Sequence, residues 1–138
     1  TEESTNSPVS AGDKLKTMTL LIVEDDKTAN LYLTELLKDK CKEIIYASNG
    51  IEAVELVRDR DNIDMVLMDI KIPQMDGYTA TQKIREFNED IIIIAQTAYA
   101  LAGDYKKAID SGCDDYLSKP IDEADLFEVV NRIIDRKK

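Results

Sequence analysis

Residues 20–26 read LLIVEDD, four apolar residues followed directly by three acidic ones. A continuous apolar run of this kind is typical of a parallel β-strand that is covered on both faces. Three neighbouring carboxylates repel one another and are costly to remove from water, so they need a cation, a basic side chain or open solvent beside them. The stretch therefore predicts a buried strand that ends at a charged site.

Strand-like segments alternate with segments of helical period along the rest of the chain. The five predicted strands are residues 19–23, 43–47, 64–68, 91–95 and 114–118. Apolar residues recur at helical spacing in the four intervals between these strands and again after the last one. Five successive βα units predict an α/β fold with a doubly wound parallel sheet, right-handed crossovers and five flanking helices.

Length and charge limit the possible functions. The 138 residues suit one domain, and the formal net charge of −10 makes nucleic acid a poor partner. No apolar stretch approaches the roughly 20 residues of a membrane span. The absence of histidine rules out a Ser-His-Asp triad and a histidine-ligated zinc. We expect a cytoplasmic protein whose partners are basic or carry a cation.

The first 17 residues differ in composition from the rest of the chain. Residues 1–17 are rich in Ser, Thr, Glu and Gly and show no sustained apolar periodicity, which predicts a disordered leader or linker before a domain at 18–138. Cys41 and Cys113 lie far apart in the sequence and lack the spacing of a metal site. Both are expected to be free thiols.

Polar residues follow the predicted strands at the sheet edge where open α/β folds bind ligands. They are Glu24, Asp25 and Asp26 after the first strand, Asp69 after the third, Thr97 after the fourth and Lys119 after the fifth. Clustered oxygen ligands without thiolate or imidazole suit Mg²⁺. Asp69 beside such an ion could act as a nucleophile toward phosphorus, and Lys119 and Thr97 could hold the phosphoryl oxygens.

Each of these residues also has an ordinary structural explanation. Asp26 would serve as the N-cap of the following helix, and Asp69 would be a loop acid before the turn residues at Asp76-Gly77. Thr97 and Lys119 taken singly would be an unremarkable strand end and a solvated lysine. Their joint occurrence at matching strand ends favours a functional site.

Four segments, in this order and spacing, resemble the receiver domain of two-component response regulators. They are LLIVEDD (20–26), MVLMDIKIPQMDG (65–77), IIIIAQTAYA (91–100) and DYLSKPI (115–121). The resemblance covers roughly residues 18–136. It implies the flavodoxin-like receiver fold with strand order 2-1-3-4-5.

The resemblance implies a role for each residue at the strand ends. Asp69 would be the phosphoacceptor, taking a phosphoryl group from a phosphohistidine on a histidine kinase or a histidine phosphotransfer domain. Asp25 would bind Mg²⁺ directly, and Glu24, where aspartate is commoner in the family, would bind it through water. Asp69 and the backbone carbonyl of Lys71 would supply further ligands. Lys119 would pair with the phosphoryl oxygens.

The resemblance also implies a conformational switch built on Thr97 and Tyr116. A phosphoryl group on Asp69 would draw the Thr97 hydroxyl toward it, and the Tyr116 ring would turn inward to fill the vacated space. The face formed by the fourth helix, the fifth strand and the fifth helix would be reshaped and read by a partner. The Lys119–Pro120 peptide bond is expected to be cis.

Two further positions bear on the lifetime of the phosphorylated state. Lys71 lies two residues past Asp69, and Tyr99 lies two residues past Thr97. A long cation and an aromatic ring there would obstruct in-line attack of water on the aspartyl phosphate, which predicts slow self-dephosphorylation. The chain would thus support its own phosphorylation and slow dephosphorylation without being a dedicated enzyme.

The sequence leaves two interpretations of the chain's context. No output module follows the last predicted helix, so the chain is either a stand-alone response regulator or the receiver of a hybrid histidine kinase. The segments VEDDKTANLYLTELLK (23–38) and MDGYTATQKIRE (75–86) resemble receivers of hybrid kinases more than those of transcription factors. They and the Ser- and Thr-rich leader favour the hybrid kinase.

Three alternatives come from other classes of protein. A small magnesium-dependent phosphatase would carry an Asp-x-Asp pattern after its first strand, whereas Asp69-Ile70-Lys71 follows the third strand and lacks the second acid. A flavodoxin-like electron carrier would need a phosphate-cradling loop after strand one, where this chain is acidic. A degenerate receiver that takes no phosphate would serve as an interaction module, although all the matching positions are filled.

Overall fold

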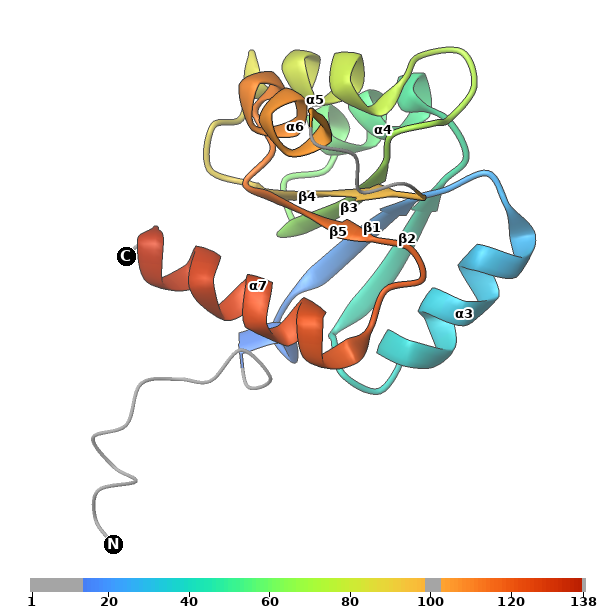
Figure 1. The fold of residues 1–138 in the computed structure, drawn as a ribbon, viewed down its shortest axis with the longest axis vertical. Coiled ribbons are helices and arrows are strands. Elements are labelled where there is room, and N and C mark those ends of the chain that lie inside the picture. Colours follow the sequence, from blue (N-terminus) through green and yellow to red (C-terminus); the bar gives the residue numbers. More distant parts are fainter. Residues whose placement is uncertain (1–13, 99–102, 138) are drawn as a thin grey trace, which may run out of the picture.

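The computed structural model describes residues 14–98 and 103–137, which form a five-stranded parallel sheet between two layers of helices (Figure 1). The strands are β1 (Thr19–Val23), β2 (Glu43–Ala47), β3 (Met65–Asp69), β4 (Ile92–Thr97) and β5 (Asp115–Ser118). Their spatial order is β2-β1-β3-β4-β5, and every neighbouring pair is parallel. The predicted fold class and strand order are confirmed.

Five helices flank the sheet, as predicted. They are α3 (Lys27–Leu37), α4 (Gly50–Asp59), α5 (Gly77–Arg85), α6 (Asp104–Ser111) and α7 (Glu123–Arg136). Helices α4, α5 and α6 cover one face of the sheet, while α3 and α7 cover the other (Figure 1). Across the described ranges, no helix combines the length and apolar character that crossing a membrane requires.

Side-chain caps set where four of these helices begin. Asp26, Asn49, Asp76 and Asp122 each accept a hydrogen bond from a backbone N–H in the first turn of α3, α4, α5 and α7 respectively. Such caps satisfy backbone donors that have no partner within the helix. Gly112, with φ of 113°, ends α6 in the left-handed conformation that glycine adopts readily. The four capped helices therefore begin just past the carboxyl ends of β1, β2, β3 and β5.

The sheet separates two apolar clusters. The cluster under α4, α5 and α6 takes Leu21, Val23, Val66, Met68, Ile93 and Ala95 from the strands. The cluster under α3 and α7 takes Leu20, Ile22, Met65, Leu67, Ile92 and Ile94. Alternate residues of each central strand therefore enter opposite cores. This explains why β1, β3 and β4 read as continuous apolar runs.

Residues 14–17 lie in the segment that the composition predicts to be a disordered leader or linker, and they are ordered. They form a helical turn in which Leu15 is completely buried in the cluster under α3 and α7. A single apolar residue among polar neighbours has no periodicity, so the sequence pattern did not reveal it. Residues 1–13 lie outside the described residues.

The two cysteines are free, as expected, and lie on opposite sides of the sheet. Cys113 belongs to the cluster under α4, α5 and α6, and burial raises the pKa of its thiol to about 11. Cys41 packs against the other cluster, and burial also raises the pKa of its thiol. Both thiols are therefore protonated at neutral pH, which disfavours a role as nucleophile or metal ligand.

Candidate functional site

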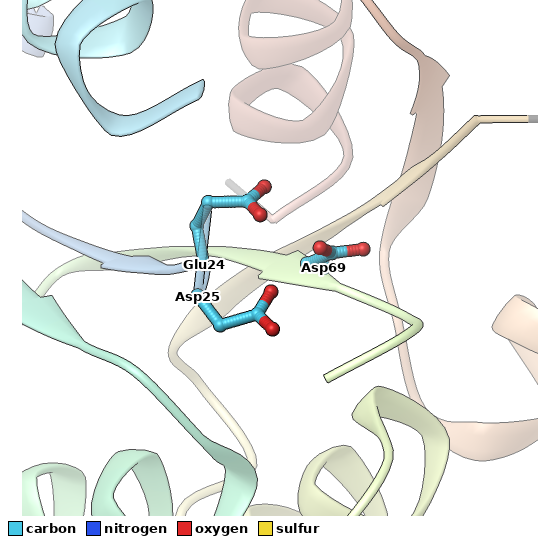
Figure 2. Close-up of side chains that lie close together, drawn as sticks. All are labelled: Glu24, Asp25 and Asp69. Atoms are coloured by element: carbon cyan, nitrogen blue, oxygen red, sulfur yellow. The ribbon is translucent and has the colours of Figure 1, made fainter. Parts of the chain in front are cut away.

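Three carboxylates meet at the carboxyl edge of the sheet. Glu24 and Asp25 follow β1 directly, and Asp69 is the last residue of β3. Strands β1 and β3 are neighbours in the sheet, with Val23 paired to Met68, so their ends lie side by side. One carboxylate oxygen from each acid lies within 4.8 Å of the others, and Figure 2 shows the three groups facing a common space.

The ammonium group of Lys119 completes this cluster. Its Nζ lies 2.8 Å from Oε1 of Glu24 and 2.9 Å from Oδ2 of Asp69. The lysine follows β5, its backbone N–H donates to the carbonyl of Thr97 at 2.7 Å, and its peptide bond to Pro120 is cis. The side chain thus spans from one strand end to two others. It acts as an internal counter-ion between the two buried acids.

Burial and pairing shift the ionisation of this cluster in opposite ways. The side chain of Glu24 is almost fully buried; burial raises its pKa, the hydrogen bond from Lys119 lowers it in part, and the charge of Asp69 raises it again. Burial lowers the pKa of Lys119, but its hydrogen bonds to Glu24 and Asp69 outweigh this and leave that pKa raised. The lysine therefore stays charged at neutral pH, and its charge holds the two carboxylates together.

The donor set of the cluster fits a hard divalent cation. With all groups ionised, three carboxylates against one ammonium leave a formal charge of −2. Asp25 is exposed, so its oxygens are open to an ion that keeps part of its water shell. The backbone N–H of Lys71 donates to Oδ1 of Asp69 at 3.1 Å, which places the Lys71 backbone beside the cluster. Oxygen donors of this kind suit Mg²⁺ rather than a thiophilic metal.

Thr97 and Tyr116 lie on adjacent strands beside Asp69. Strand β4 was predicted to end at residue 95, but it continues to Thr97, because its ladder pairs Gln96 with Asp69 and Thr97 with Ser118. Thr97 is buried and Tyr116 is half-buried, and alternation along the strands puts both side chains on the α4–α6 side. The Tyr116 ring lies 5.5 Å from that of Tyr105 on α6.

Sequence reasoning missed some residues at the site. Gln96 is 1% exposed, lies opposite Asp69 in the ladder and donates a long 3.4 Å bond to the carbonyl of Leu67. Its amide within the run IIIIAQT was a visible signal, because a polar side chain in a buried strand needs a reason. Asn30 donates to the carbonyl of Glu24 at 3.1 Å, which no pattern indicated. Tyr99, expected to affect timing, lies outside the described residues.

Comparison with known proteins shows the family of the chain. A family model described as the response regulator receiver domain matches residues 20–131. The chain belongs to this family. It is a receiver domain of a two-component phosphorelay, as the resemblance implied. Membership of this family decides against the phosphatase and the flavodoxin-like electron carrier.

Relatives of the receiver domain match it either over a short part of their length or over nearly all of it. The sensor protein GacS of Pseudomonas syringae pv. syringae is 41% identical over 112 residues, which cover 77% of this chain and 12% of GacS. The chemotaxis protein CheY of Halobacterium salinarum is 33% identical over 115 residues, covering 83% of this chain and 95% of CheY. The receiver therefore spans a small part of the length of GacS and nearly all of CheY.

A solved structure shares both the fold and part of the sequence of the receiver. It is the receiver domain of the response regulator Ssk1 of Saccharomyces cerevisiae, in a co-crystal structure with the histidine phosphotransfer signaling protein Ypd1. The match has a TM-score of 0.74 and 32% identity, and it covers 81% of this chain and 85% of that chain.

Proposed function

We propose that Asp69 accepts a phosphoryl group from a phosphohistidine, in a reaction that requires Mg²⁺. The observation that carries this proposal is the position of Lys119, whose ammonium bonds Asp69 and Glu24 at once within the acidic cluster. From this position the ammonium can hold an oxygen of a phosphoryl group on Asp69 and offset its charge. Asp69 is also held at its other oxygen by the Lys71 N–H, so the carboxylate has a fixed orientation.

In the proposed transfer, a carboxylate oxygen of Asp69 attacks phosphorus, the new P–O bond forms and the P–N bond to the donor imidazole breaks. The electron pair stays on the imidazole nitrogen, which takes up a proton. Lys119, already beside Asp69, holds a phosphoryl oxygen and offsets its charge. Asp25, Asp69, the Lys71 carbonyl and, through water, Glu24 would hold Mg²⁺, which would supply positive charge to offset the carboxylates and the phosphoryl oxygens.

We propose that the phosphoryl group is sensed by Thr97 and Tyr116. The backbone carbonyl of Thr97 already accepts a bond from Lys119, so the threonine is linked directly to the lysine that contacts the reacting group. Movement of the Thr97 hydroxyl toward Asp69 frees space on the α4–α6 side, where the Tyr116 ring packs. The readout is then a changed surface over α6, β5 and α7.

The proposed phosphodonor is a histidine kinase or a histidine phosphotransfer domain. The yeast relative with a histidine phosphotransfer partner supports this choice. On this chain, α3 and its neighbouring loops offer the docking surface, where Leu31 is 68% exposed beside Asn30 and Thr34.

We further propose that the receiver is part of a hybrid histidine kinase. The similarity to a segment of GacS supports this, while the similarity to nearly all of CheY supports the alternative of a stand-alone regulator. The size of the native polypeptide, detected with an antibody to this domain, decides between them. The proposed location is the cytoplasm, or the cytoplasmic side of a membrane-bound kinase, and the two free thiols fit a reducing compartment.

The phosphorylated state is predicted to decay slowly. Lys71 is exposed and follows the acceptor by two residues, so its long side chain can screen the aspartyl phosphate from in-line attack by water. The decay of the adduct, followed by intact-mass spectrometry after removal of the phosphodonor, measures the lifetime. A half-life of seconds would refute the prediction, and a faster decay in Lys71→Ala would assign the effect to this side chain.

Incubation with acetyl phosphate and Mg²⁺ tests the proposed function. Intact-mass spectrometry is expected to show a single phosphoryl adduct that disappears in Asp69→Asn and on chelation of Mg²⁺. Asp61→Asn, which makes the same change at an exposed acid before the start of β3, the end of the strand opposite Asp69, serves as the matched control and should keep the adduct. No adduct on the wild-type chain would leave the carboxylate cluster structural and favour an interaction module.

A further inference from the structure

Helix α3 makes a long-range polar contact with the loop that follows β5. The hydroxyl of Tyr32 donates to the backbone carbonyl of Ile121 at 2.5 Å, between residues 89 positions apart in the chain. The neighbouring Leu33 is buried in the core, whereas the Tyr32 ring is partly exposed. The hydroxyl therefore adds a directional link between helix and loop that the apolar core does not supply.

The loop that Tyr32 contacts carries Lys119 two residues earlier. The backbone N–H of Lys119 itself donates to the carbonyl of Thr97 at 2.7 Å, which attaches this end of the loop to β4. Two residues after the lysine, the loop is attached to the rest of the protein by the buried side chain of Ile121 and by the hydrogen bond from Tyr32. The backbone of Lys119 thus lies between one attachment to β4 and one attachment to α3.

A cavity of about 440 Å³ lies on the α3 side of this loop. Its lining includes Tyr32, Leu33, Gln96, Lys119, Pro120 and Ile121. This space is open to solvent and is not filled by side chains, so packing alone leaves the loop room to shift toward α3. The hydroxyl of Tyr32 bonds the loop to the helix beside this space.

The same helix also holds a second member of the cluster. Asn30, half a turn before Tyr32, donates to the backbone carbonyl of Glu24 at 3.1 Å. Lys119 bridges Glu24 and Asp69 with distances of 2.8 and 2.9 Å, so a small displacement of the loop would lengthen both bonds. We propose that Tyr32 is a positioning residue that sets the reach of Lys119 to Asp69. This inference rests on the proposed role of Asp69 as phosphoacceptor.

Substitution Tyr32→Phe tests the inference, because it removes the hydroxyl and keeps the ring that lines the cavity. The rate of adduct formation with acetyl phosphate and Mg²⁺ is expected to fall about fivefold, the effect of losing one ordinary hydrogen bond. Tyr46→Phe is the matched control, since the Tyr46 hydroxyl also contacts α3, at Thr34 Oγ1, but away from the Lys119 loop. The control should react at the wild-type rate.

A double-mutant cycle distinguishes positioning of Lys119 from a general loss of structure. In a Lys119→Met background, Tyr32→Phe should cause no further loss of rate, because the side chain that it positions is absent. NMR of the lysine side-chain Nζ groups in the metal-free protein gives a second readout. The signal assigned to Lys119 by its absence in Lys119→Met should move in Tyr32→Phe and stay in place in Tyr46→Phe.

Three results would overturn the inference: a wild-type rate in Tyr32→Phe, an equal loss in the Lys119→Met background, or an unmoved Lys119 signal. Failure of the proposed function has a different signature. In that case the wild-type chain forms no adduct at all, while the Lys119 signal still reports whether Tyr32 positions the lysine.

Discussion

Lys119→Met is expected to slow phosphoryl uptake at Asp69 about 100-fold, the effect of removing one preorganised donor from a transition state. The ammonium now lies 2.9 Å from Asp69 and bonds Glu24 as well, so it meets the incoming phosphoryl oxygens without rearrangement. Methionine keeps much of the chain length and loses the charge. Intact-mass spectrometry over a time course with acetyl phosphate and Mg²⁺ measures the rate.

The same substitution is expected to lower the free energy of unfolding of the metal-free protein by about 2 kcal/mol. Glu24 and Asp69 are both buried, and without the lysine they face each other with no cation between them. Added Mg²⁺ should therefore stabilise Lys119→Met more than it stabilises the wild type, as urea unfolding with and without the ion will show.

Lys38→Met is the control for the lysine substitution. Lys38 forms an ion pair with Glu35 in which both side chains are well exposed, so its loss should change stability by less than about 1 kcal/mol. Equal destabilisation in the two variants would contradict the buried ion pair as the cause. A wild-type rate of uptake in Lys119→Met would contradict the role of the lysine in transfer.

Gly77→Ala is expected to lower the free energy of unfolding by about 2 kcal/mol and to slow phosphoryl uptake. A Cβ atom at this first residue of α5 would lie 2.5 Å from the backbone oxygen of Asp69 and 2.9 Å from Cα of Ile70. These are backbone atoms of the segment that carries the acceptor, so relief requires Asp69 to move. The gain of about 1 kcal/mol from placing alanine in a helix is too small to offset the clash.

Gly103→Ala provides the comparison for this prediction. A Cβ atom at Gly103 meets no described atom within 4 Å, and its φ of −86° is open to alanine. Urea unfolding should show little change in the free energy of unfolding of Gly103→Ala and a large decrease in that of Gly77→Ala. If Gly77→Ala unfolds and reacts like the wild type, the close approach of α5 to the Asp69 backbone does not constrain the site.

Much of the fold could be predicted from local patterns, because both faces of the sheet are buried. Continuous apolar runs located β1 and β3 to within one residue, and N-caps such as Asp122 placed the helix starts. Features that depend on contacts with distant strands and helices could not be predicted from local patterns. Strand β4 extends to Thr97 because β5 pairs with it there, and Leu15 is buried in a cluster whose other members come from distant parts of the chain.

The acids of the site could be predicted because they follow neighbouring strands, and strand ends meet at one edge. Glu24, Asp25 and Asp69 do come together, and Lys119 joins them. The bond from Tyr32 to Ile121 could not be predicted, since a contact across 89 residues leaves no local pattern. Its detection requires knowing that α3 and the loop after β5 lie side by side.

The placement of α3 and α6 on opposite faces of the sheet has a consequence for evolution. The two helices pack on separate apolar clusters that share only the backbone of the strands. After a gene duplication, substitutions that suit one copy to a new phosphodonor can accumulate on α3 without requiring compensating changes beneath α6. A duplicated receiver can therefore acquire a new phosphodonor while it keeps the inherited surface over α6. It can equally change that surface while it keeps the same phosphodonor.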